Sequence, residues 1–154
     1  MDYIEKMVNR CGVILNIPKP DVELHKFESD EISAMFIPSS YSIMVKKLWM
    51  ESANVVEIFI IICHEMRHAY QYMQINCQDG LGESQEIIAR WKAEFDHYYS
   101  PKDERFLAQE IEIDAIAFAH YMTLEVFNEE KVIPIEIVER VSEKLIQISN
   151  TIKG

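Results

Sequence analysis

The chain has 154 residues, of which 49% are hydrophobic and 27% are charged, with only four glycines and five prolines. This size and composition predict one globular domain over residues 1–154 that buries its core without disulfide bonds. The formal charge of -11 argues against direct binding to nucleic acid or to an anionic membrane surface, because both are themselves negatively charged.

The first 46 residues predict one helix followed by short strands. Apolar residues within 2–16 recur at the three- and four-residue spacing of an amphipathic helix, and Pro18 ends that pattern. Residues 22–46 instead alternate between apolar and polar in short runs, with a Pro-Ser-Ser turn at 38–40. We therefore expect two or three short strands after the first helix.

A long central helix is expected from Asn54 to about Ile75. Asn54 and Glu57 have the spacing of a capping box, and the following residues contain neither glycine nor proline. The run 58–63 is apolar throughout, so the helix needs cover on every side, yet the run is far shorter than the roughly 20 residues that span a bilayer. We expect this helix to lie in the core.

The rest of the chain predicts three more helices. A glycine-rich loop over 78–82 leads into an amphipathic helix over 83–98. The Ser-Pro pair at 100–101 has the N-cap and N1 residues of a helix that would run to about Phe127. A last helix would begin at Pro134. Several helices together with a few short strands indicate an α+β fold.

The sequence His64-Glu65-Met66-Arg67-His68 falls within the central helix and has the spacing of a zinc site. Residues four apart lie on one face of a helix, so both imidazoles can bind the same Zn²⁺ ion. Glu65 would lie beside the metal as the general base and accept a proton from a zinc-polarised water. This pattern predicts a zinc-dependent hydrolase.

A catalytic zinc needs a third protein ligand, and Glu110, Glu112 and Asp114 are the candidates. They lie among the apolar residues of 108–119, where a buried carboxylate is costly unless a metal or a hydrogen-bond donor compensates it. Glu112 is about 200° around the helix from the other two. At most one or two of the three can therefore face the metal.

The motif followed by Glu112-x-x-Ala115-x-x-Phe118-Ala119 resembles the ImmA/IrrE-type zinc metallopeptidases, as a divergent member. The resemblance implies a minimal zincin fold with a short sheet packed against a helical bundle, and Glu112 as the third zinc ligand. The register of thermolysin-like gluzincins would instead use Glu110 as the ligand, with Asp114 orienting a ligand histidine. Glu112 is the first choice and Glu110 the runner-up.

The same resemblance has implications for substrate and biology. It implies hydrolysis of peptide bonds in an intracellular protein, with a strand in the region 32–45 binding the substrate backbone. Related proteins occur in phages and other mobile elements. The sequence identifies neither the substrate nor the oligomeric state.

Other residues are candidates for supporting roles. Tyr70, Tyr121 and His97 could each donate a hydrogen bond to the oxyanion of the reaction, although aromatic residues at helical spacing more often only pack. Cys63 precedes His64, and one residue of helix turns its side chain about 100° away from that of His64. We expect Cys63 to be a buried structural thiol. Arg67 is expected to be a surface or ion-pairing residue and not a substrate clamp.

Cysteine usage and the N-terminal residues favour a cytoplasmic location. Cys11, Cys63 and Cys77 are odd in number and have no metal-binding or disulfide spacing. The first residues are acidic where a secretory signal peptide would be basic.

Two other functions fit parts of the sequence. Glu65-x-x-His68 and Glu94-x-x-His97 are two Glu-x-x-His motifs, as found in di-iron carboxylate oxidoreductases. These bundles also need single glutamates on two other helices. A non-catalytic, metal-stabilised interaction module is the third possibility, and the intact base Glu65 argues against it.

Overall fold

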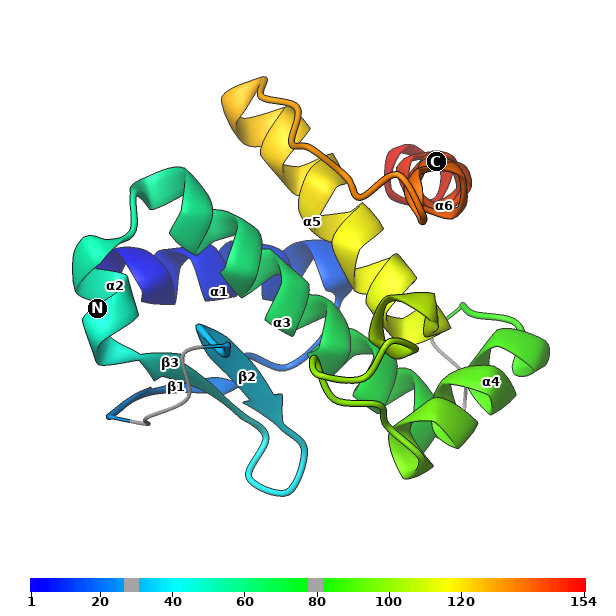
Figure 1. Cartoon of the computed structure of the whole chain (residues 1–154), viewed down its shortest axis with the longest axis horizontal. Helices are drawn as coiled ribbons and strands as arrows, with labels where there is room; N and C mark the ends of the chain where they lie inside the picture. The colour runs from blue at the N-terminus through cyan, green and yellow to red at the C-terminus, as the bar shows by residue number, and fades with distance from the viewer. Residues whose placement is uncertain (27–30, 78–81) are drawn as a thin grey trace.

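The computed structural model describes residues 1–26, 31–77 and 82–154. These residues form six α-helices, one short 3-10 helix and one three-stranded sheet (Figure 1). The helices are α1 (Asp2–Leu15), α2 (Lys47–Ser52), α3 (Val55–Asn76), α4 (Gln85–Asp96), α5 (Glu110–Phe127) and α6 (Val138–Lys153), with the 3-10 helix η1 at Phe106–Ala108. The strands are β1 (Asp21–His25), β2 (Ala34–Ile37) and β3 (Ser42–Lys46). The expected α+β class is confirmed, while positions 78–81 of the expected glycine-rich loop lie outside the described residues.

Where two or three strands were expected, three form one small sheet in the order β1-β3-β2. β1 runs parallel to β3, and β2 runs antiparallel to it with Phe36 opposite Ile43. Alternate side chains of β2 are buried, among them Ala34 and Phe36, so one face of the sheet packs on the helices. β2 lies at the sheet edge, next to α3.

The central helix α3 is confirmed, including its capping box. The Asn54 side chain accepts from the backbone N–H groups of Val56 and Glu57, and the Glu57 carboxylate accepts from the Asn54 backbone. This box satisfies N–H groups that the first turn of a helix leaves without partners. α1, α4, α5 and β2 all contact α3, which explains why its first turns can be apolar on every side.

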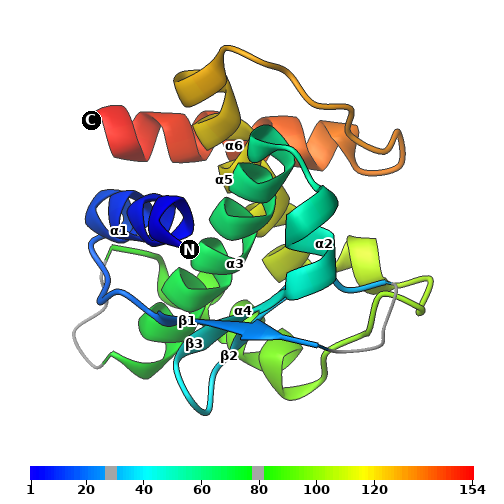
Figure 2. The same cartoon turned by 90° about the vertical axis from the view of Figure 1, so that its left-hand side faces the viewer.

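The elements stack from the sheet to the C-terminal helix. Figure 2 shows the sheet on one side of α3 and α6 on the other. α5 packs against both α3 and α6, and α1 packs against α3. Within the part of the chain that the structure describes, no helix combines the length and apolar character needed to cross a bilayer. The two helices at the centre of this stack, α3 and α5, carry the candidate site.

The fifth helix begins nine residues later than the sequence predicted, at Glu110 and not at Pro101. The Ser-Pro pair at 100–101 does not start a helix; residues 100–105 form turns and α5 begins at Glu110. The reason is a contact across the fold, because the Glu94 carboxylate accepts hydrogen bonds from the N–H groups of Glu110 and Ile111. The segment 97–109, between α4 and α5, consists of turns and the short helix η1.

Two smaller differences concern the other ends of helices. Pro134 begins a turn rather than a helix, since the Ile137 N–H bonds to the Pro134 carbonyl and the Ile137 backbone is not helical. α6 therefore starts at Val138. The short helix α2, directly after β3, was not expected, and none of its residues is buried.

Candidate metal centre

His64 and His68 lie one turn apart on α3 with their imidazoles side by side. Their Nε2 atoms are 3.1 Å apart, and the two ring planes are nearly perpendicular at 82°. The i,i+4 spacing of the motif produces this pairing directly, because both side chains project from the same helix face. Both rings line one cleft.

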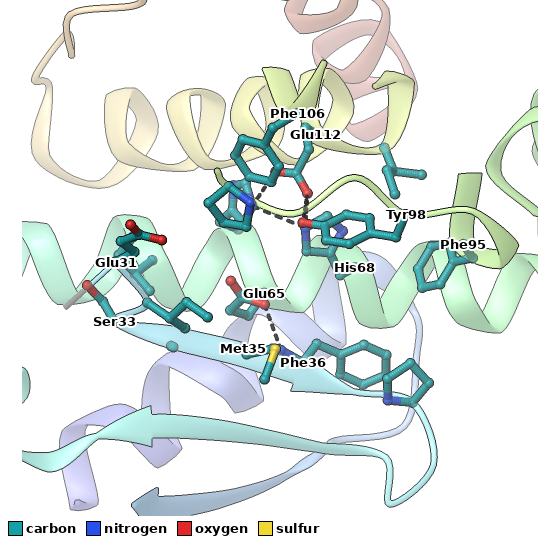
Figure 3. Close-up of a pocket in the computed structure, with 17 residues that line it drawn as sticks. Glu31, Ser33, Met35, Phe36, Glu65, His68, Phe95, Tyr98, Phe106 and Glu112 are labelled. Atoms are coloured by element: carbon teal, nitrogen blue, oxygen red, sulfur yellow. Dashed lines mark hydrogen bonds and ion pairs between the residues drawn. The ribbon is translucent and has the colours of Figure 1, made fainter. Parts of the chain in front are cut away.

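Glu112 comes from α5 and lies against both histidines, and Figure 3 shows it beside His68. Its Oε2 atom is 3.2 Å from His64 Nε2, and its Oε1 atom is 3.3 Å from His68 Nε2. One ligand atom from each of the three residues lies within 4.8 Å of the others. Two imidazole nitrogens and a carboxylate oxygen converge on one point, as in a three-ligand zinc site.

The electrostatics of Glu112 favour a bound cation. Its side chain is only 1% exposed, and its Oε2 atom is buried without a hydrogen-bond partner among the described residues. Burial opposes ionisation of Glu112, but the adjacent histidines hold its pKa well below the usual range. An ionised carboxylate with an unsatisfied buried oxygen is a fitting ligand for a metal.

The interaction with Glu112 also shifts the pKa of His68. Burial alone would lower its pKa, yet the charge and the hydrogen bond of Glu112 raise that pKa to about 9. The centre therefore attracts positive charge, as protons or as a metal ion.

The other two acids of the first half of α5 point elsewhere. Glu110 pairs with Arg140 and Arg90, and Asp114 pairs with Arg67. This separation follows the 100° rotation per helical residue that makes Glu112 face away from both. Among the three sequence candidates, Glu112 is the one that the structure brings to the histidines.

Glu65 lies next to the metal centre but faces β2. Its Oε2 accepts a hydrogen bond from the Phe36 backbone N–H at 2.7 Å, and its side chain lines the same cleft as the histidines. Burial raises its pKa, while the charges of His64 and His68 lower it, and the pKa stays above the usual value. Glu65 therefore has the position and the raised basicity of a proton acceptor.

The cleft over these residues has a volume of about 440 Å³. Its floor is α3, one wall is the stretch 31–38 that includes β2, and the other wall is the segment between α4 and α5 with the start of α5 (Figure 3). The walls are mostly apolar, with contributions from Met35, Phe95 and Phe106. An apolar cleft with a few converging polar groups is typical of a ligand-binding site.

Tyr98 is a site residue that the sequence did not reveal. Its hydroxyl donates to Glu112 Oε1 at 2.8 Å, and its ring lines the cleft. Burial and the negative charge of Glu112 raise its pKa, so the hydroxyl keeps its proton. Tyr98 lies in the irregular segment after α4, where no helical spacing links it to the motif.

The three residues considered as oxyanion donors are not among those that line the cleft. The Tyr70 hydroxyl donates to Glu83, which precedes α4. The Tyr121 ring lies near Lys153, and His97 is the C-cap residue of α4.

The remaining sequence candidates lie away from the metal centre. Cys63 is fully buried with its sulfur 3.5 Å from that of Cys11, and Arg67 forms the ion pair with Asp114, as expected for both. Glu94 is engaged with the first N–H groups of α5. Within the described ranges, the metal-binding group contains neither Glu94 nor His97, so the geometry does not favour a di-iron centre.

A comparison of the chain with protein-family models, curated proteins and solved structures finds no match. The structure brings His64, Glu65, His68 and Glu112 together at one cleft and adds Tyr98 to them.

Proposed function

We propose that this protein is a zinc-dependent metallopeptidase in which His64, His68 and Glu112 hold the metal and Glu65 is the general base. The observation that carries the proposal is the convergence of the two Nε2 atoms and the Glu112 carboxylate at the floor of an apolar cleft. The donor set of two histidines and one glutamate leaves a coordination position open for water, as catalytic zinc sites do.

When bound, zinc would act as a Lewis acid that polarises the peptide carbonyl and acidifies water. Glu65 accepts the proton of the attacking water and later delivers it to the leaving amine, and its raised pKa suits both transfers. The hydrogen bond from Phe36 N–H fixes the carboxylate during both steps. Tyr98 keeps its proton, which it donates to Glu112 Oε1 in this structure, and it faces the same cleft. Turning this O–H toward the substrate would let it donate to the oxygen that becomes negative.

The cleft supports a peptide as the substrate. β2 is an edge strand whose residues 34–36 line the cleft, and an extended peptide can lie along such an edge. The apolar side chains of Ile61, Phe95 and Phe106 surround the remaining space. We propose that a protein segment binds in extended form and places an apolar side chain beside the bond that is cut.

The test compares the purified wild-type protein with Glu65→Gln. Elemental mass spectrometry should find about one zinc per chain in both proteins, because Glu65 is a base and not a ligand. Both proteins are then incubated with a peptide library, and new termini are identified by mass spectrometry. The wild type should cleave at least about 100-fold faster than the variant, the lower end of general-base contributions.

Other outcomes would contradict the proposal in distinct ways. Two irons per chain would favour an oxidoreductase. Equal cleavage by both proteins would remove Glu65 from the mechanism. Zinc binding without any cleavage would point to a metal-stabilised interaction module.

A further inference from the structure

Gln71 is a fully buried polar residue that the proposed mechanism does not use. It lies on α3 three residues after His68 and is 0% exposed. Its Oε1 atom is 2.8 Å from His68 Nδ1, and its Nε2 atom is 3.0 Å from the Ile111 carbonyl oxygen and 2.7 Å from Asp114 Oδ2. The hydrogen bonds of this amide therefore connect His68 to the first turns of α5.

These contacts fix which end of the amide faces the histidine. The Ile111 carbonyl and the Asp114 carboxylate only accept hydrogen bonds, so the Gln71 NH₂ group must face them. The Gln71 oxygen then faces His68, and it can only accept. His68 must accordingly donate from Nδ1, which leaves Nε2 as the nitrogen that faces His64 and Glu112.

Two cations, the buried Arg67 and the partly buried Lys144, hold the Asp114 carboxylate. Asp114 is 1% exposed and accepts from Arg67 Nε at 2.7 Å and from Arg67 Nη2 at 3.0 Å. Lys144 Nζ, from α6, lies 3.5 Å from Asp114 Oδ1. The Asp114 carboxylate, held by these two cations, accepts from the Gln71 NH₂ group and holds the amide in one orientation.

We propose that Gln71 is a positioning residue for the metal centre: it holds the His68 ring with Nδ1–H donated and Nε2 presented to the metal. Asp114 and the Ile111 carbonyl in turn hold Gln71. Outer partners of this kind fix the orientation of a ligating histidine and its protonated nitrogen. Here an amide stands between the carboxylate and the histidine, so Asp114 acts on His68 through Gln71 and not by direct contact.

This inference rests on the metal-binding part of the proposed function. The central variant is Gln71→Met, which keeps a side chain of similar length but cannot accept a hydrogen bond. The matched control is Gln74→Met, because Gln74 lies on the same helix and is 1% exposed. Zinc affinity is measured by competition with a chromophoric chelator, and thermal unfolding shows whether each variant folds.

We expect Gln71→Met to bind zinc roughly 10- to 100-fold more weakly than the wild type, the usual cost of losing such an outer partner. Gln74→Met should bind zinc as the wild type does. Equal affinities in the wild type and both variants would overturn the inference while leaving the metal site intact. A wild-type protein that binds no zinc would refute the metal site itself, and this inference with it.

A second measurement needs no variant and does not depend on cleavage. Nuclear magnetic resonance of the zinc-loaded, ¹⁵N-labelled wild type should show a proton on His68 Nδ1 that exchanges slowly with water, because Gln71 holds it in a buried hydrogen bond. In folded Gln71→Met that proton should exchange faster. A wild-type spectrum in which His68 binds zinc through Nδ1 would overturn the inference. This result is decisive even if Gln71→Met does not fold.

Discussion

The carboxylate of Glu94 caps the helix on which Glu112 lies. Its two oxygens accept hydrogen bonds from the backbone N–H groups of Glu110 and Ile111, each at 2.9 Å. A negative charge at this position satisfies two N–H groups that have no partner within the helix and favours the positive end of the helix dipole. Glu94 thereby fixes where α5 begins, and with it the position of Glu112 in the first turn.

Replacing Glu94 should weaken both the fold and the metal centre. We expect Glu94→Ala to lower the free energy of unfolding by about 1–2 kcal/mol, the loss typical of an N-terminal cap, and to reduce zinc affinity. Glu143→Ala, at an exposed position of α6, is the control and should change neither quantity. Urea unfolding and zinc titration measure the two effects. An unchanged zinc affinity in Glu94→Ala would show that the cap does not position Glu112.

Zinc binding should distinguish the acids of α5. Glu112→Ala removes a ligand and should cost more affinity than the roughly 10- to 100-fold that the loss of an outer partner costs. Glu110→Ala should leave zinc affinity unchanged, because Glu110 pairs with Arg140 and Arg90. Metal titration of the two variants checks this, and the opposite order would support the thermolysin-like register instead.

Tyr98 should matter for turnover more than for metal binding. We expect Tyr98→Phe to lower kcat by about 100-fold or more, as the loss of an oxyanion donor does, while zinc content stays near one per chain. Tyr99→Phe is the matched control, because the Tyr99 ring stacks against Arg105 and not in the cleft. Steady-state cleavage of a peptide found in the library screen gives kcat and KM. A change confined to KM would assign Tyr98 to substrate binding alone.

His120 should give the stability of the protein a dependence on pH. Burial of this side chain, with a smaller contribution from the charge of Lys131, lowers its pKa. The unfolded chain therefore binds a proton more readily than the folded one, and stability should fall as the pH drops below about 6.5, the usual histidine value. His120→Gln should lessen this fall. Unfolding in urea between pH 8 and pH 5 measures it, and identical slopes in both proteins would contradict the prediction.

Features that depend on neighbouring residues in the sequence could be predicted. The capping box of α3 involves residues three apart, and the pairing of His64 with His68 involves residues four apart. Helix geometry alone places such residues together. The preference for Glu112 needed more, namely the resemblance to a family, because helix rotation shows only that Glu112 faces away from Glu110 and Asp114.

Features that depend on contacts across the fold could not be predicted. The beginning of α5 is set by Glu94, which lies on another helix, so the local Ser-Pro signal at 100–101 was misleading. Tyr98 reaches Glu112 from an irregular segment, and Gln71 acquires its contacts with Ile111 and Asp114 only when α5 packs on α3. A local sequence pattern does not predict such contacts unless the packing of the helices is known.

The division of the ligand atoms between α3 and α5 ties folding to metal supply. A metal that joins His64 and His68 to Glu112 would cross-link the two central helices, and the unfolded chain offers no such preformed site. Free zinc at 100 times its dissociation constant would then add about 2.7 kcal/mol to the free energy of unfolding. The melting temperature would rise with zinc concentration, so the thermal stability of the protein would report how much metal its surroundings provide.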